Sequence, residues 1–126
     1  MKSLKQEYKI EASIESVWDA LVNPKTIKKW GGGPAKMSDK KGSEFSLWGG
    51  DIHGTNTRVI KQKLLAQDWM AGKWDEYSQV EFKLSFKNGV TKVALTQKNI
   101  PPQEFSEIAD GWVTYYMGEI KKLLEG

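Results

Sequence analysis

The longest regular pattern of apolar residues lies at the C-terminal end of the chain. After Pro102, apolar side chains recur at steps of three and four, as on one face of an α-helix: Phe105, Ile108, Ala109, Trp112, Tyr116, Ile120 and Leu124. Pro102 suits the first helical turn, where its missing N–H is not needed. About 23 residues at 1.5 Å each make a helix of roughly 35 Å. Such a helix, with aromatic residues on one side, needs a broad apolar surface to lie on.

Alternating apolar and polar residues predict the strands that provide this surface. The first strand has apolar side chains on one face, at Leu4, Tyr8, Ile10 and Ala12. Further strands are predicted at 44–48, at 52–60 and at 64–69, with turns at Gly49-Gly50-Asp51 and Lys61-Gln62-Lys63.

The clearest hairpin turns at Asn88-Gly89. These residues favour a two-residue type I′ turn, because both tolerate positive φ. Four apolar residues before the turn are expected to face inward: Val80, Phe82, Leu84 and Phe86. The turn sets Leu84 opposite Val93 and Phe82 opposite Leu95. A slip of one residue would expose the whole apolar set to water, so we expect this register.

Two short helices are predicted after the first strand. Ser13 caps one helix, whose apolar residues Ile14, Val17, Trp18 and Leu21 fall at helical spacing. Asn23-Pro24 ends it and begins a second helix with Ile27 and Trp30 on its buried side. The element order predicts an α+β fold in which a curved antiparallel sheet of about six strands surrounds the long C-terminal helix. We expect residues 1–126 to form one such domain.

Composition excludes several kinds of catalytic chemistry. The chain has no cysteine, and His53 is its only histidine, which excludes thiolate catalysis, cysteine-bound zinc and histidine-based triads. The acidic residues do not form a spaced pair for acid–base work. We therefore expect no catalytic residue, metal or cofactor. No apolar run approaches the roughly 18 residues of a membrane span, and no secretory signal is visible, which favours a cytoplasmic protein.

The distribution of charge favours a protein partner over nucleic acid. Arg58 is the only arginine among 19 basic residues, whereas nucleic-acid readers use several arginines for bidentate contacts. Six lysines fall in one short segment whose only acid is Asp39: Lys25, Lys28, Lys29, Lys36, Lys40 and Lys41. This segment is either solvated surface or a docking patch that steers an acidic partner.

The six tryptophans fall into two groups. Trp18, Trp30 and Trp112 lie on apolar helix faces and are expected in the core. Trp69 is also expected there, whereas Trp48 and Trp74 are either core residues or anchors for a partner. A curved sheet and a straight helix leave space between them, and we expect it to be apolar and mostly filled. Its candidate walls are Phe45, Trp69, Phe82, Leu84, Leu95, Trp112, Tyr115 and Tyr116.

Several segments in this order resemble the activator-of-Hsp90-ATPase (Aha1) C-terminal-domain-like family, within the Bet v 1/START-like helix-grip superfamily. The similar segments are 14–21, 42–47, 49–54, 67–69, 91–97, Ile100-Pro101, Gly111-Trp112, Tyr115-Tyr116 and Ile120-Lys121. They extend over nearly the whole chain, from about residue 6 to residue 125.

The resemblance implies a co-chaperone domain of the stress response that binds Hsp90 and promotes its ATPase cycle. We expect this domain to be a monomer that binds neither nucleic acid nor a membrane. Full-length members have an additional N-terminal domain, so we expect weak stimulation by this chain alone. The alternative is a protein that binds or carries a small hydrophobic ligand, which requires an apolar void of about 300 Å³ or more. A third hypothesis is an enzyme of the same superfamily, but the sequence shows no nucleophile–base pair that would support it.

Overall fold

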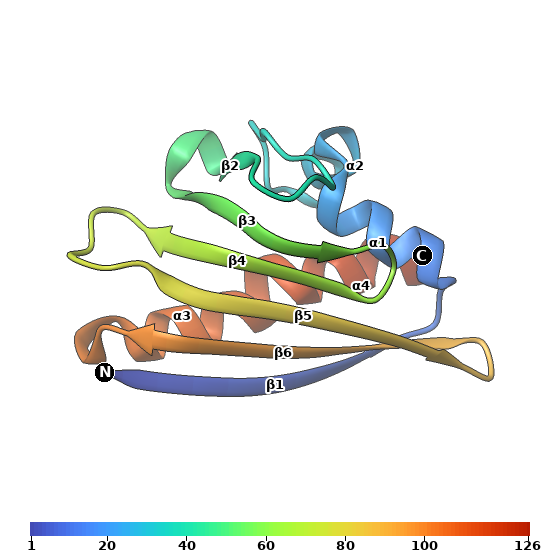
Figure 1. Ribbon diagram of the computed structural model, residues 1–126. Helices are drawn as coiled ribbons and strands as arrows, with labels where there is room; N and C mark the ends of the chain where they lie inside the picture. The colour runs from blue at the N-terminus through green and yellow to red at the C-terminus, as the bar shows by residue number, and fades with distance from the viewer.

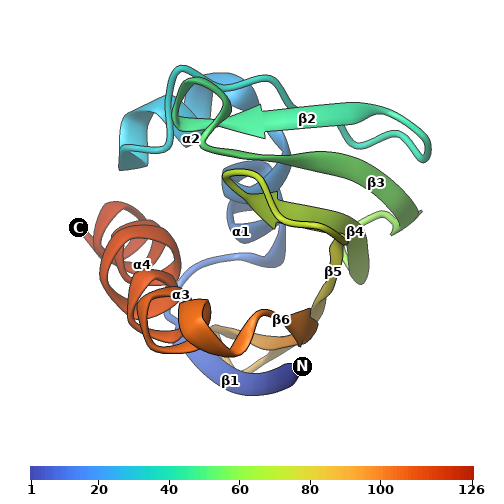
Figure 2. The ribbon, with the colours of Figure 1, turned by 90° about the vertical axis from the view of Figure 1, so that its left-hand side faces the viewer.

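A six-stranded antiparallel sheet forms the body of the protein, in the order β1-β6-β5-β4-β3-β2. The structure is a computed structural model that describes all 126 residues. Its strands are β1 (Lys2–Ile10), β2 (Glu44–Leu47), β3 (Ile52–Ile60), β4 (Leu64–Ala71), β5 (Ser78–Lys87) and β6 (Val90–Ile100). The sheet curves around the C-terminal helix, as the end-on view shows (Figure 2). The predicted fold class is confirmed.

Two short helices, α1 (Ile14–Val22) and α2 (Pro24–Trp30), connect β1 to the segment before β2 and lie across one end of the sheet (Figure 1). Both begin at the predicted caps. Ser13 Oγ accepts from Ser16 N at 3.2 Å, and Asn23 Oδ1 accepts from Lys25 N at 3.0 Å. None of the helices has the length and apolar character needed to cross a bilayer.

The C-terminal helical segment differs from the uninterrupted α-helix predicted. It consists of a 3₁₀ turn (Pro102–Glu104), α3 (Phe105–Gly111), a π-helical turn (Trp112–Tyr116) and α4 (Met117–Glu125). In the π-turn the N–H of Met117 donates to the carbonyl oxygen of Trp112, five residues back. Trp112 and Tyr116, the first and last residues of this turn, are buried, and so are Met117 and Ile120 in α4.

The predicted register of the β5–β6 hairpin is confirmed, with Phe82 opposite Leu95 and Leu84 opposite Val93. The expectation that Phe86 faces the core is wrong, because its side chain is 50% exposed. The hairpin extends beyond the helices at this end of the sheet, so nothing covers the last inward-facing position (Figure 1). Strand β4 also continues to Ala71, two residues beyond the predicted end.

Two aromatic residues of the C-terminal helix, Trp112 and Tyr116, lie in the core, as predicted. Trp112 and Tyr116 are 2% and 3% exposed. Their ring centroids lie 5.7 and 6.0 Å from that of Phe82. Trp18, Trp30 and Trp69 belong to the same buried cluster. The helix and the sheet are therefore joined by packed aromatic rings, edge-on between Phe82 and Trp112 and tilted between Phe82 and Tyr116.

Candidate functional site

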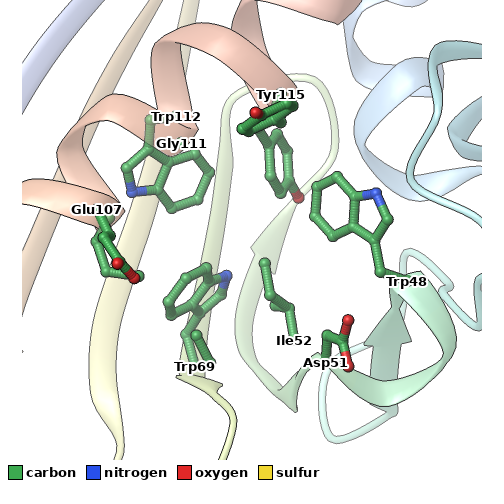
Figure 3. Close-up of a pocket in the computed structure, with 11 residues that line it drawn as sticks. Trp48, Asp51, Ile52, Trp69, Glu107, Gly111, Trp112 and Tyr115 are labelled. Atoms are coloured by element: carbon green, nitrogen blue, oxygen red, sulfur yellow. The ribbon is translucent and has the colours of Figure 1, made fainter. Parts of the chain in front are cut away.

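An open pocket of about 450 Å³ lies between the C-terminal helix and the strands β3 and β4 (Figure 3). Eight of its 11 lining residues are hydrophobic. Five of the lining residues are aromatic: Trp48, Trp69, Trp112, Tyr115 and Tyr116. The expectation of a mostly filled space thus does not hold here, although the helix–sheet space farther along is filled by core side chains such as Phe82 and Leu95.

Trp48 reaches the pocket from a tight turn, the 3₁₀ segment Trp48–Gly50 between β2 and β3. Three successive residues have positive φ there, at 49°, 68° and 107°, and glycine occupies the last two positions. The turn is held by the segment after α2, because Trp48 N donates to Gly32 O at 2.8 Å and Gly49 N donates to Pro34 O at 3.0 Å. The Trp48 ring therefore stands at the pocket edge, edge-on to Tyr116 at 6.0 Å.

The deep wall is formed by stacked indoles. Trp69 and Trp112 stack with ring centroids 5.4 Å apart, and Trp112 packs on Tyr116 at 4.6 Å. Trp112 Nε1 donates to Gln97 Oε1 at 2.8 Å. Trp69 Nε1 is buried but has no hydrogen-bond partner. In Figure 3 the edge of Trp69 that carries this nitrogen is turned toward the space between the helix and Ile52.

The charged residues that line the pocket are all acidic. Asp51 and Glu107 lie on opposite sides of it, both exposed, and no lysine, arginine or histidine is among the lining residues (Figure 3). Burial raises the pKa of the Tyr116 phenol above its usual value, so this hydroxyl stays neutral at ordinary pH.

The floor of the pocket is open beside Gly111, because a Cβ at that position would meet no atom within 4 Å. Gly111 has ordinary helical dihedrals (φ −62°, ψ −39°), so the backbone does not require glycine there. A side chain at this position would instead project into unfilled space.

The predicted site residues fall into three places. Phe45, Phe82, Leu84 and Leu95 are buried in the core and do not line the open pocket. Trp69, Trp112, Tyr115 and Tyr116 do line it, together with Trp48. Trp74 packs against Trp69 at 6.0 Å but lies outside the pocket, in the loop after β4.

The six lysines of the segment 25–41 are all exposed and form what we call the lysine lobe. Lys25, Lys28 and Lys29 lie on α2, and the other three lie on the loop between α2 and β2, which runs from that helix to the far end of β2 (Figure 2). None of the four salt bridges in the protein includes a lysine of the lobe. The lobe therefore presents positive charge that no acidic side chain neutralises by direct contact.

Sequence reasoning did not identify Asp51, Ile52 or Glu107 as pocket residues. Asp51 and Ile52 follow the glycine turn, and Glu107 lies four residues before Gly111 on the helix. The helical spacing of Glu107, Ile108 and Gly111 was a usable signal, since residues three and four apart share a helix face.

A curved antiparallel sheet that holds one long C-terminal helix, with a pocket between them, defines a helix-grip protein of the Bet v 1-like class. The family model described as Activator of Hsp90 ATPase homolog 1-like protein matches residues 11–125, and the chain belongs to this family.

Known relatives agree with this assignment. The chain is 25% identical over 123 residues to an activator of 90 kDa heat shock protein ATPase homolog from Dictyostelium discoideum, covering 95% of the chain and 32% of the relative. It is 26% identical over 112 residues to homolog 1 of Mus musculus, covering 87% of the chain and 33% of the relative. The chain thus spans about a third of the length of these curated relatives.

Solved structures extend the similarity to the fold. A crystal structure of an HSP90 activator from Plasmodium falciparum matches with a TM-score of 0.91 and 26% identity, covering 99% of this chain and 97% of that one. A protein from Mesorhizobium loti matches with a TM-score of 0.85 and 22% identity, covering 98% and 97% of the two chains, and this likeness concerns the fold alone.

Proposed function

We propose that residues 1–126 act as a single interaction domain that binds Hsp90 and promotes its ATPase cycle. The observation that carries this proposal is the family match over residues 11–125, supported by relatives named as Hsp90 activators. The pocket holds no histidine or cysteine to serve as a base or nucleophile, which favours a binding domain over an enzyme. We further propose that this domain acts as a monomer in the cytoplasm.

The lysine lobe is the surface that we assign to the first encounter with Hsp90. Unpaired, exposed charges of one sign raise association rates toward an acidic surface. The screening length is about 8 Å at physiological salt, so binding through the lobe weakens as ionic strength rises. Trp48 lies at the edge of the lobe, since its backbone is bonded to Gly32 just after α2, and it supplies an aromatic anchor.

The test is binding to purified Hsp90, with and without nucleotide, at low and at physiological salt. The triple variant Lys28→Glu, Lys29→Glu, Lys40→Glu is compared with Lys5→Glu, Lys87→Glu, Lys98→Glu, which changes the net charge equally at exposed positions on β1, β5 and β6. We expect the first variant to associate roughly tenfold or more slowly and the second to change little. Absence of binding at low salt, or equal loss in both variants, would count against the proposal.

Ligand binding is a second candidate function, and the open pocket favours it. Its volume of about 450 Å³ lies within the usual range for small-molecule sites, roughly 300–1,000 Å³. The pocket contains no lysine of the lobe, but Trp48 belongs both to the pocket and to the proposed Hsp90 contact, so the two binding events meet at this residue.

A further inference from the structure

We infer that the open pocket binds a small organic cation, an alkylated ammonium group on an apolar or aromatic body. This inference concerns the pocket and goes beyond Hsp90 binding, on which it does not rest.

The aromatic walls are the first reason. The negative face of an indole or phenol ring attracts a cation within about 6 Å of its centroid, most strongly when the cation is an ammonium group stripped of water. Trp69 and Trp112, each 2% exposed and stacked on one another, close the deep wall, so the rings that a cation can face are Trp48 at the edge and Tyr115, which is 66% exposed, at the mouth. A cation that enters between them exchanges water for ring faces.

The charges around the pocket are the second reason. Asp51 and Glu107 are the only charged lining residues, so the pocket is negative although the whole chain has a net charge of +3. A second groove carries three carboxylates, those of Asp75, Glu76 and Glu104, and two cationic groups, the Lys73 side chain and the terminal ammonium of Met1. An anionic ligand such as a fatty acid would meet repulsion and no basic partner, whereas a cation meets a carboxylate on each side.

The unpartnered indole nitrogen is the third reason, and it narrows the ligand further. Trp69 is 2% exposed, and its Nε1 has no acceptor. A buried donor without a partner carries a free-energy cost that a ligand acceptor atom would remove. Since the nitrogen edge faces the pocket (Figure 3), a ligand with a hydroxyl or ether oxygen close to its ammonium group satisfies both features of the site.

The experiment compares charged and neutral ligands of the same shape. The protein is titrated with choline, with benzyltrimethylammonium and with the neutral carbon analogue of each, in which tert-butyl replaces trimethylammonium. Binding is followed by tryptophan fluorescence and by NMR shifts of the pocket residues. We expect each cation to bind roughly tenfold more tightly than its analogue, as cation–π attraction in a desolvated site implies.

Three variants locate the effect. Asp51→Asn combined with Glu107→Gln should weaken the cations about tenfold and leave the neutral analogues unchanged. Asp39→Asn in the lysine lobe, exposed and without a side-chain partner, is the matched control and should change nothing. Gly111→Leu should abolish binding of all four compounds, because its side chain fills open space without touching neighbouring atoms at Cβ.

Four outcomes would overturn the inference: no cation binding at tens of millimolar, equal affinity for the neutral analogues, equal affinity in the doubly neutralised variant, or cation binding that survives Gly111→Leu. Tight binding of laurate at the same site would also overturn the inference, because it would show that the pocket prefers an anionic ligand to a cationic one. A thermal melt of each variant verifies that the fold is intact.

Discussion

The indole nitrogen of Trp112 donates a 2.8 Å hydrogen bond to Oε1 of Gln97, which joins the C-terminal helix to strand β6 inside the core. Gln97 is 0% exposed, and its Nε2 donates in turn to Ser78 Oγ at 2.8 Å. The largest aromatic side chain of the helix is thus fixed both by packing and by a buried polar network, and the two contributions can be separated by substitution.

Trp112→Ala is expected to lower the free energy of unfolding by about 3–5 kcal/mol, the usual range for large aromatic-to-alanine changes in a core. Trp112→Phe keeps much of the packing but leaves Gln97 Oε1 without its donor, which costs about 1–3 kcal/mol. Urea denaturation of both variants measures the difference. Equal losses in the two variants would mean that the hydrogen bond, and not the ring, supplies the stability.

The two glycines of the C-terminal helix should respond oppositely to alanine. A Cβ at position 118 would lie 1.9 Å from the carbonyl oxygen of Val113, which the π-turn brings close, so Gly118→Ala forces the turn to rearrange. Gly111→Ala meets nothing within 4 Å and should raise the free energy of unfolding by up to about 1 kcal/mol through helix propensity. Thermal melts of both variants test this, and stabilisation by Gly118→Ala would contradict the π-turn geometry.

Acid should selectively remove one contact of the C-terminus. The carboxylate of Glu125 accepts from Lys121 Nζ at 2.8 Å and from Glu11 N at 2.9 Å, and these bonds lower the pKa of Glu125 below its usual value. A lowered folded-state pKa contributes stability above the unfolded-state pKa and loses it as pH falls through the folded-state value.

Glu125→Gln should therefore be less stable than the unaltered protein at neutral pH, and the difference should shrink below about pH 4.5, the usual pKa of the group. Urea denaturation across pH 2–7 gives the profile. A difference that stays constant from pH 7 to pH 2 would contradict this assignment.

Local signals in the sequence were sufficient for most of the fold. Asn88-Gly89 fixes the hairpin register, and Ser13 and Asn23 mark the helix starts, because each acts through atoms within a few residues. Phe86 was misplaced because alternation says which face a residue takes, not whether anything covers it. The π-turn was missed because apolar spacing of four fits both an α-helix and a helix with one additional residue.

The pocket was the least predictable part. Its aromatic residues were recognised as candidate walls, but its two carboxylates come from segments that only the closed sheet brings together, at Asp51 and Glu107. The volume left between the helix and the sheet depends on the side chains of several strands and on the missing Cβ at Gly111. The pattern of residues within one segment does not contain this information.

The position of Trp48 beside the lysine lobe leads to a last prediction about Hsp90. Trp48 N is bonded to Gly32 O at 2.8 Å, next to α2, whereas Trp74 lies in the loop after β4 and packs on Trp69. If the lobe makes the first contact, an aromatic side chain at its edge is buried in the complex and a remote one is not.

Trp48→Ala should then weaken Hsp90 binding by roughly tenfold, mainly through faster dissociation, whereas Trp74→Ala should not. Surface plasmon resonance with both variants and with the lysine triple reversal separates the effects, since the lysines act on the association rate. A larger loss from Trp74→Ala than from Trp48→Ala would move the proposed contact to the groove that Trp74, Asp75 and Glu76 line.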